Sequence, residues 1–189
     1  MKNNILIFWV LVWVPAHSCI NKVYLNNING YLNASDTAEK SKYMAENYHS
    51  FFINKKGICK NKSEILLSFK NWDGQLHPEI TIINYSFHDS VWEVEFNEQN
   101  DISKAIHFPG WKGRETFIFN SNNLIEETVY IPDSTNLSFK PFLQPALDWL
   151  QKNMPDKLSE VYQNNKLIQT ETAANKWEML LNEWQAQRK

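Results

Sequence analysis

Glu115 is the side chain of this sequence best suited to acid–base chemistry. It stands in the alternating segment 114–120, and Phe117 follows it on the same face of the expected strand. A carboxyl group that faces an apolar interior loses hydration, which raises its pKa, and the neutral acid can then donate a hydrogen bond. The alternative is an exposed ion pair with Arg114 or Lys112, and the sequence leaves both interpretations open.

His107 is the second candidate catalytic residue. It precedes the sequence Phe-Pro-Gly-Trp, and a histidine can exchange a proton near neutral pH. We expect it at the mouth of a site, with a solvated loop histidine as the alternative. The five histidines form no HxH or HExxH spacing, so we predict no metal site. With only five glycines and no phosphate-binding loop, the chain is also predicted to use no nucleotide cofactor.

Aromatic side chains recur at positions that a folded sheet would turn inward. Period-two alternation puts Trp92 and Glu95 on opposite faces, and it separates Tyr130 from Glu127 in the same way. We predict that Trp92 faces inward. The predicted ligand-binding residues are Tyr48, Trp72, Trp92, Phe117 and Tyr130.

The elements that must position these side chains follow from periodicity. Spacings of three and four predict helices at 23–33, 36–52 and 63–72, the second capped by Asp36. Alternating β-branched and aromatic residues predict strands at 80–87, 91–96, 105–108, 114–120 and 124–131. The remaining chain is helical in pattern, with segments at 142–150 and 155–162 and a last helix capped by Thr170. This order predicts an α+β fold in which helices cover one face of a curved antiparallel sheet.

Composition restricts the class of protein. The 189 residues are 43% hydrophobic and 21% charged, with a formal net charge of -2, as in a packed domain. The basic residues are scattered and balanced by acidic ones, so we predict no nucleic-acid partner. The aromatic residues of the last segment are expected to dock it on the convex side of the domain, with a partner-binding groove as the alternative.

The amino terminus has the pattern of an export signal. Lys2 precedes the apolar run 5–14, and a zone of mostly small residues follows up to Cys19. The run is shorter than the ~20 residues of a membrane-spanning helix. Ser18-Cys19 resembles the end of a bacterial lipoprotein signal, so Cys19 is the predicted lipidation site. We expect a membrane-anchored lipoprotein of a bacterial envelope or, with ordinary cleavage, a periplasmic or secreted protein. Cys59 is then predicted to be a structural thiol.

The segment GRETFIFNSNNLIEETVYIPD, residues 113–133, resembles the last hairpin of the SnoaL-like and ketosteroid-isomerase-like branch of the nuclear transport factor 2-like superfamily. YLNASD, residues 31–36, is similar to the end of that family's first helix, and 36–52 to its second. The resemblance covers about residues 23–133. Together with the export pattern and the helical periodicity of the last segment, it predicts three parts: a signal peptide at 1–19, a nuclear transport factor 2-like domain at 23–133, and a helical C-terminal extension at 134–189.

The resemblance implies a cone-shaped sheet with an apolar cavity, which the family uses for isomerisation, cyclisation, dehydration or binding. The family's strand acid falls on Glu115. Its carboxylate base falls on or near Phe52, and its helix tyrosine on or near Ile28, and neither of these side chains can move a proton. The isomerase pattern is therefore incomplete in this sequence.

Three hypotheses follow for the function. The first is a protein that holds a small apolar or aromatic ligand in the cone. The second is an isomerase, cyclase or dehydratase that uses Glu115 with His107 or a cavity tyrosine, and it requires polar side chains that converge inside the site. The third is an interaction module or homodimer, which requires a contiguous exposed apolar patch.

The predicted lipid anchor can be tested in cells. Cys19→Ser removes the sulfur that would carry the lipid, so the variant should move from the membrane fraction to the soluble fraction. Cell fractionation and immunoblotting measure this, with Cys59→Ser as the control. An unchanged distribution of Cys19→Ser would exclude an acyl anchor.

Overall fold

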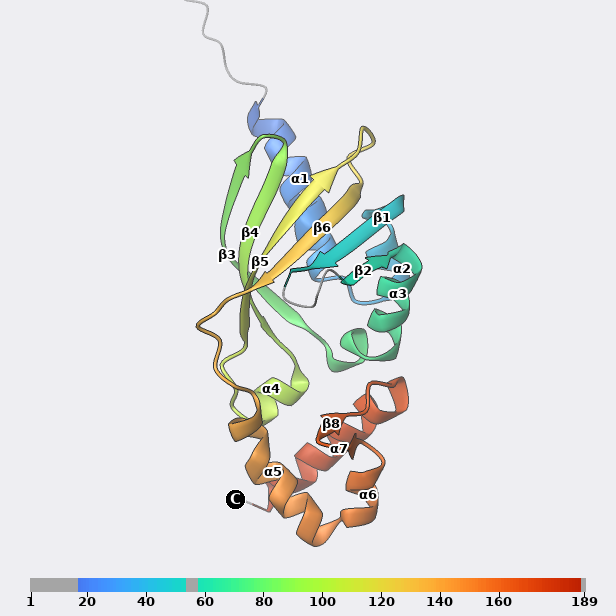
Figure 1. The fold of residues 1–189 in the computed structure, drawn as a ribbon, viewed down its shortest axis with the longest axis vertical. Coiled ribbons are helices and arrows are strands. Elements are labelled where there is room, and N and C mark those ends of the chain that lie inside the picture. The colour runs from blue at the N-terminus through green and yellow to red at the C-terminus, as the bar shows by residue number, and fades with distance from the viewer. Residues whose placement is uncertain (1–16, 54–57, 188–189) are drawn as a thin grey trace, which may run out of the picture.

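The structure is a computed structural model that describes residues 17–53 and 58–187. The predicted signal segment 1–19 lies largely outside the described residues. Figure 1 shows two parts stacked along the long axis, a curved β-sheet with its helices and, beyond one end of it, a group of C-terminal helices. The predicted α+β class is confirmed.

Helical segments and pairs of strands alternate along the chain. The helices are α1 (His17–Leu32), α2 (Thr37–Ser41), α3 (Lys62–Asn71), the 3-10 helix η1 (Asp73–Leu76), α4 (Asp101–Ala105), α5 (Lys140–Asn153), α6 (Pro155–Ser159) and α7 (Glu171–Ala186). The strands are β1 (Met44–Phe52), β2 (Ile58–Asn61), β3 (Glu79–His88), β4 (Val91–Gln99), β5 (Trp111–Phe119), β6 (Ile125–Pro132), β7 (Tyr162–Gln163) and β8 (Lys166–Leu167).

The main sheet has six strands in the order β2-β1-β6-β5-β4-β3. Its pairs are antiparallel except for β1 and β6, which run parallel. The sequence predicts an all-antiparallel sheet. The parallel pair arises because β1, which falls within the helix predicted at 36–52, lies beside β6, the last strand of the meander. Strands β3 and β4 meet in a tight turn at Asp89 and Ser90, whose φ angles of 50° and 69° are the left-handed values that such hairpin turns need.

The predicted helix caps are present. The carboxylate of Asp36 accepts a hydrogen bond of 2.8 Å from the backbone N–H of Glu39 at the start of α2. Thr170 accepts one of 3.2 Å from the N–H of Ala173 at the start of α7. Side-chain oxygens at these positions satisfy backbone donors that the helix leaves free.

The helix predicted at 36–52 is wrong beyond its first turns. The chain leaves α2 at Ser41 and continues as β1 from Met44. Met44 and Tyr48 lie four residues apart, and this spacing puts two residues on one face of a helix and also on one face of a strand. An irregularity in the pairing between Met44 and His49 further breaks the two-residue period.

The strand predicted at 105–108 is also wrong. Asn100 caps α4 there, accepting a 2.9 Å hydrogen bond from the N–H of Ser103. The helix ends in a turn at His107, whose φ of 55° is left-handed. Polar residues that cap a helix favour it over a strand. The strand was predicted from the apolar residues of 105–108 alone, which give no indication of the cap at Asn100.

The upper core lies between α1 and the concave face of the sheet. From α1 it takes Ile28, Tyr31 and Leu32, which are three and four residues apart and so share one helix face. Their partners on the sheet include Trp92 and Phe117, both almost fully buried. Helix α3 packs beside this core against β1. Helices therefore cover the concave face except at the edge strand β3, and we call the region between them and the sheet, with its lining, the cone.

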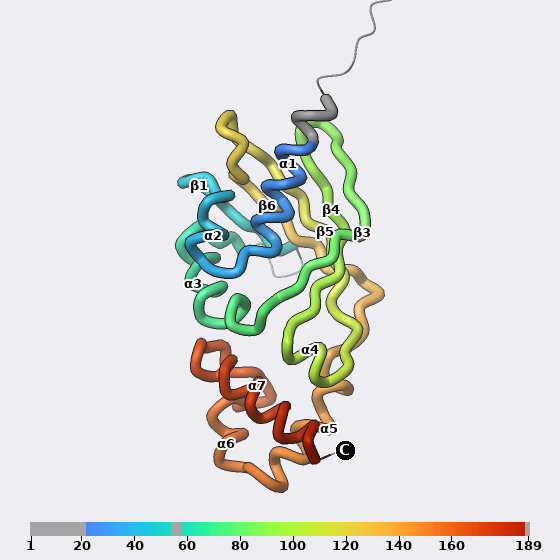
Figure 2. The backbone as a smooth tube through the Cα atoms, turned by 180° about the vertical axis from the view of Figure 1, so that it is seen from behind, coloured from blue at the N-terminus to red at the C-terminus, as the bar shows by residue number. Residues whose placement is uncertain are grey.

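The C-terminal helices have a core of their own. Trp177 and Trp184 of α7 are buried there with Leu147 and Leu150 of α5, and Trp72 joins them from the end of α3. Figures 1 and 2 place these helices beyond the end of the sheet, next to α4. The predicted docking on the convex side is thus wrong, because the apolar surface that they cover belongs to η1 and α4.

Gly113 gives a test of the packing on the concave face. A Cβ atom at this position would lie 2.5 Å from Cε2 of Tyr130, which is closer than carbon atoms approach. Gly113→Ala should therefore lower the free energy of unfolding by about 1–3 kcal/mol. Urea unfolding measures this. In a protein that already carries Tyr130→Ala, adding Gly113→Ala should cost much less stability, because the ring that the new methyl group meets is absent. A stability cost of Gly113→Ala that is the same with and without the ring at position 130 would contradict this packing.

Candidate functional site

Cross-strand pairing places the candidate residues on one face. Glu115 pairs with Val94 on β4 and with Tyr130 on β6. Phe117 pairs with Trp92 and with Thr128 in the next row. Directly paired residues point to the same side of a sheet, and alternation repeats this every second residue. The side chain of Trp92 points inward, as we predicted from alternation.

Glu115 is buried in the cone, with 8% of its surface exposed. Burial raises the pKa of its carboxyl group to about 7, while the positive charge of Lys40 and the hydroxyl of Thr128 act in the opposite direction. The exposed ion pair considered from the sequence is not formed, because Arg114 faces the other side and pairs with Glu93 at 3.5 Å. Glu115 is thus a carboxyl group that holds its proton close to neutral pH.

Lys40 brings a second charge into the cone. It lies in α2, and its Nζ donates a hydrogen bond of 2.7 Å to the backbone carbonyl of Tyr31. The same Nζ lies 3.9 Å from the centroid of the Tyr31 ring and 4.8 Å from that of Phe69. Burial lowers the pKa of Lys40 to about 8, opposed by the negative charges of Glu115, Asp73 and Glu98. Among the described residues Lys40 forms no direct ion pair, so its charge is held by a carbonyl, two rings and more distant carboxylates.

Hydroxyl groups form a buried chain beside Glu115. The hydroxyls of Tyr31 and Tyr48 are 2.7 Å apart, and that of Tyr48 is 2.8 Å from Oγ1 of Thr128. Thr128 in turn donates to Oγ of Ser50 at 3.1 Å. Burial raises the pKa of Tyr31 well above its ordinary value and that of Tyr48 to about 12. These phenols therefore stay neutral at physiological pH and serve as hydrogen-bond donors and acceptors.

We call the end of the sheet next to the C-terminal helices the wide end, and the opposite end, at the turn between β3 and β4, the narrow end. Burial decreases from Glu115 toward the wide end. Tyr130 is half-buried, and burial followed by the charges of Glu98 and Glu115 raises its pKa to about 12. Glu98 is half-buried too, and burial, then the charge of Asp73, raises the pKa of its carboxyl group. Asp73 itself is exposed. The acidic groups thus lead from the interior to solvent at this end.

Trp92 has a polar atom without a partner. Its side chain is 2% exposed, and among the described residues its Nε1–H has no acceptor. The indole packs against Phe87 and Tyr24, with ring centroids 5.0 and 6.1 Å away. A buried N–H without an acceptor costs about 1–3 kcal/mol. An oxygen atom of a ligand in this part of the cone would satisfy it.

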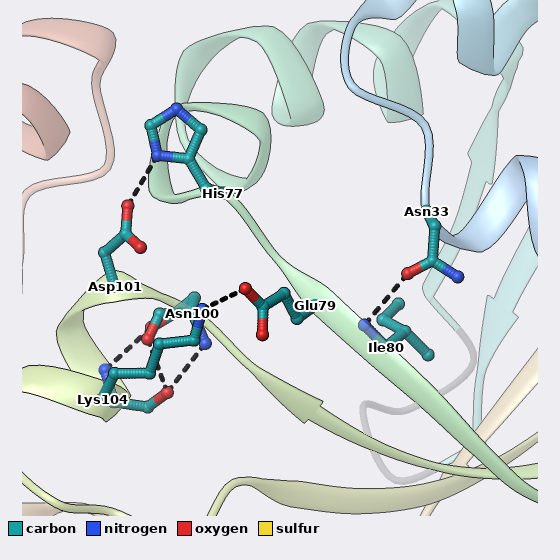
Figure 3. A network of polar contacts seen from close by, with 8 residues as sticks. Asn33, His77, Glu79, Ile80, Asn100, Asp101 and Lys104 are labelled. Atoms are coloured by element: carbon teal, nitrogen blue, oxygen red, sulfur yellow. Dashed lines mark hydrogen bonds and ion pairs between the residues drawn. The ribbon is translucent and has the colours of Figure 1, made fainter.

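A polar network fixes the start of β3 at the wide end (Figure 3). Nδ1 of His77 lies 2.6 Å from a carboxylate oxygen of Asp101, and Nζ of Lys104 lies 2.5 Å from one of Glu79. His77, which follows η1, and Glu79 of β3 are thereby tied to α4. A side-chain oxygen of Asn33, which follows α1, accepts a 3.1 Å hydrogen bond from the N–H of Ile80. The helices that border the cone are thus joined to the strand at its edge.

Two predicted site residues lie elsewhere. His107 is exposed in the turn after α4, where its N–H donates to the carbonyl of Lys104, and it is not on the concave face. Trp72 belongs to the core of the C-terminal helices, with Trp177 and Trp184 of α7, so its predicted place in the cone is wrong. The other predicted side chains, Tyr48, Trp92, Phe117 and Tyr130, do share the concave face with Glu115.

Sequence reasoning missed part of the site. Tyr31 lies three residues after Ile28, so both side chains share the buried face of α1, where only Ile28 was considered as a site position from the sequence. Ser50 escaped notice because the strand character of β1 was not recognised. Thr128 lies in a strand that was predicted, but its partners on β1 were not. For Lys40 the sequence offers no signal, since a lysine in a short capped helix is ordinarily exposed.

Phe52 packs edge-on against Tyr130, with ring centroids 6.0 Å apart. Cys59 is an exposed free thiol, so the structural role predicted for it is wrong.

Other kinds of site were sought in the described part of the chain. Its His, Cys, Asp and Glu side chains form no group of three or more that could hold a metal ion. No helix between residues 17 and 187 is long and apolar enough to cross a membrane. Hollows of about 280 and 220 Å³ border α7, the first lined by Asp101, Glu178 and Gln185 among others. Both lie outside the cone.

Comparison with known proteins concerns the fold. No protein-family model matches the chain, and no curated protein matches it. A solved protein of cystatin-like fold from Methylobium petroleophilum is 16% identical, with a TM-score of 0.49 over 62% of this chain and 80% of that one. An NTF2-like protein from Burkholderia xenovorans is 8% identical, with a TM-score of 0.47 over 66% of this chain and 93% of its own.

A SnoaL-like protein from Burkholderia thailandensis is also 8% identical, with a TM-score of 0.46 over 60% of this chain and 96% of that one. These likenesses concern the fold alone and carry no information about a role.

The pKa of Glu115 predicts how stability depends on pH. The folded protein keeps this proton up to about pH 7, whereas the unfolded chain loses it near the ordinary value of 4.5. The folded state therefore binds more protons between these values, and the free energy of unfolding should fall as pH rises from about 4.5 to 7. Glu115→Gln should flatten this slope, and thermal unfolding across the pH range measures it. Glu93→Gln, on the convex face, is the control; a slope that Glu115→Gln leaves unchanged would contradict the assignment.

Proposed function

We propose that this protein binds a small, largely apolar molecule in the cone and holds an oxygen atom of that molecule at Glu115. The observation that carries the proposal is the burial of Glu115 among Tyr48, Thr128 and aromatic side chains without a direct ion pair. A buried carboxyl group with a raised pKa can donate a hydrogen bond to a carbonyl or hydroxyl oxygen. The ring faces of Phe117 and Trp92 suit an apolar or aromatic body.

Lys40 is the side chain that a ligand would displace. Its Nζ fills space between α1, α3 and the sheet, and it is held there by a single hydrogen bond to Tyr31 together with the rings. A lysine has a flexible four-carbon chain, and a buried ammonium gains hydration when it moves outward. The exposed carboxylate of Asp73 would attract it at the wide end. Entry of a ligand is thus coupled to a change in the position of Lys40.

The proposal is tested by ligand binding. Phenols and cyclic ketones serve as probes, with thermal shift as a first screen and calorimetric titration for the compounds that stabilise the protein. Glu115→Gln replaces the acid by an amide of the same shape whose N–H is a weaker donor than a carboxyl O–H, so it should weaken binding by up to about tenfold. Lys40→Met removes the charge that must leave, so its affinity should equal or exceed that of the wild type.

The control is Glu93→Gln on the convex face, which should bind as the wild type does. Equal affinity of Glu115→Gln and the wild type, with both proteins folded, would remove Glu115 from the site. A panel that stabilises none of the variants, Lys40→Met included, would overturn ligand binding in the cone.

A second candidate function is an acid–base enzyme of the isomerase, cyclase or dehydratase type. The chain of hydroxyls from Tyr31 through Tyr48 to Thr128 favours it, because polar side chains converge beside the carboxyl group. In such an enzyme Glu115 would transfer the proton, and Tyr48 would stabilise a negative oxygen atom. Turnover of a bound cyclic ketone, lost in both Glu115→Gln and Tyr48→Phe, would distinguish this function from simple binding.

We also propose that the chain is exported and anchored through Cys19. Support comes from the order of Lys2, the apolar run 5–14 and Ser18-Cys19 in the sequence. Fractionation of Cys19→Ser in cells is the test.

A further inference from the structure

Aromatic side chains are exposed at the narrow end of the cone. On β3, Tyr85 and Phe87 are 53% and 47% exposed, and on α1 Val23 is 45% exposed. Tyr24 is half-buried beside them, since it and Phe87 both pack against Trp92. We call Val23, Tyr24, Tyr85 and Phe87 the end patch. It exists because α1 covers β4 to β6 and leaves the concave side of the edge strand β3 open.

The end patch lies where the chain enters the fold. Figures 1 and 2 agree that the start of α1 is beside the hairpin of β3 and β4, at the end opposite to the C-terminal helices. Cys19 belongs to the first turn of α1, four residues before Val23. At a rise of about 1.5 Å per residue, an anchor at Cys19 is only about 6 Å along the helix from the patch. No spacer separates the proposed anchor from the fold, so this end would be held against the bilayer.

We propose that the end patch is a membrane-docking surface that rests on the lipid headgroup region of a bilayer. Tyrosine has an apolar ring and a polar hydroxyl, which suits it to this region. The exposed cation of Lys22 on the same stretch of α1 can face anionic headgroups. The patch adds its own apolar area to the attachment, because binding to a bilayer grows with the apolar area inserted.

The size of the end patch argues against a second copy of this chain as its occupant. Rings of this size bury about 150–250 Å² each, so three partly exposed rings and a valine offer roughly 400 Å². A stable dimer needs about 800 Å² per partner. A bilayer sets no such minimum, because binding grows with the apolar area inserted.

The inference rests on the proposed anchor for its geometry, and the experiment separates the two. The full chain carrying Cys19→Ser, which cannot be acylated at this residue, is mixed with vesicles of phosphatidylethanolamine and phosphatidylglycerol, and the bound fraction is measured by sedimentation. Tyr85→Ser combined with Phe87→Ser should lower the partition coefficient at least about tenfold. Met179→Ser is the matched control, because Met179 is apolar and 62% exposed but lies in α7 at the other end.

The apolar run 5–14 is present in every variant, so it cannot account for a difference between them. Equal partition of the double variant and the parent, or equal losses in the double variant and Met179→Ser, would overturn the docking surface. The docking surface would also be overturned if the parent protein self-associates and does not bind vesicles, and if this self-association is lost in the double variant. Thermal unfolding verifies that the double variant is folded, and Val23→Ser provides a second, milder change with the same expected direction. The anchor is judged independently, by the fractionation of Cys19→Ser in cells.

Discussion

The structure is organised around a carboxyl group that the sheet turns away from water. Glu115 occupies an inward position of β5 between Val94 and Tyr130, and the alternation of the strand allows it no other direction. An isolated carboxylate would be costly there, and two features reduce the cost. The group keeps its proton close to neutral pH, and Lys40 supplies a positive charge within the same space. Such an arrangement has little value for stability, since apolar side chains would pack there without the penalty, and we therefore interpret it as a site.

The surroundings of Glu115 are arranged in a gradient. At the narrow end the lining is apolar around Trp92 and Phe117, and the middle holds the hydroxyls of Tyr48 and Thr128. Toward the wide end Glu98 and Asp73 continue the acidic character to the surface. An elongated molecule with one oxygen-bearing end and one apolar body matches this order. The C-terminal helices lie beyond the wide end and pack on η1 and α4, so they help to hold the elements through which the acidic groups reach solvent.

Much of the architecture could be predicted from the sequence because it depends on local periodicity. The strands of the meander alternate clearly, and the side-chain caps at Asp36 and Thr170 were recognised because capping chemistry is local. The errors arose where local signals compete. Met44 and Tyr48 satisfy both periods, and the turn at His107 follows a short helix whose cap outweighs a strand-like run. His107 was accordingly assigned to the wrong place, and Trp72 to the wrong core.

By itself the sequence determined the α+β class, from the order of its periodic segments, and the inward direction of Trp92, from alternation along one strand. For Glu115 it left an inward and an exposed position open. Only the tertiary structure decided which residues meet that carboxyl group. Lys40 comes from a short helix, Tyr31 from α1, and Thr128 and Ser50 from a parallel pair of strands far apart in sequence. The physical reason is that a pKa and a hydrogen-bond partner depend on distances across the fold, and no period along the chain encodes those distances.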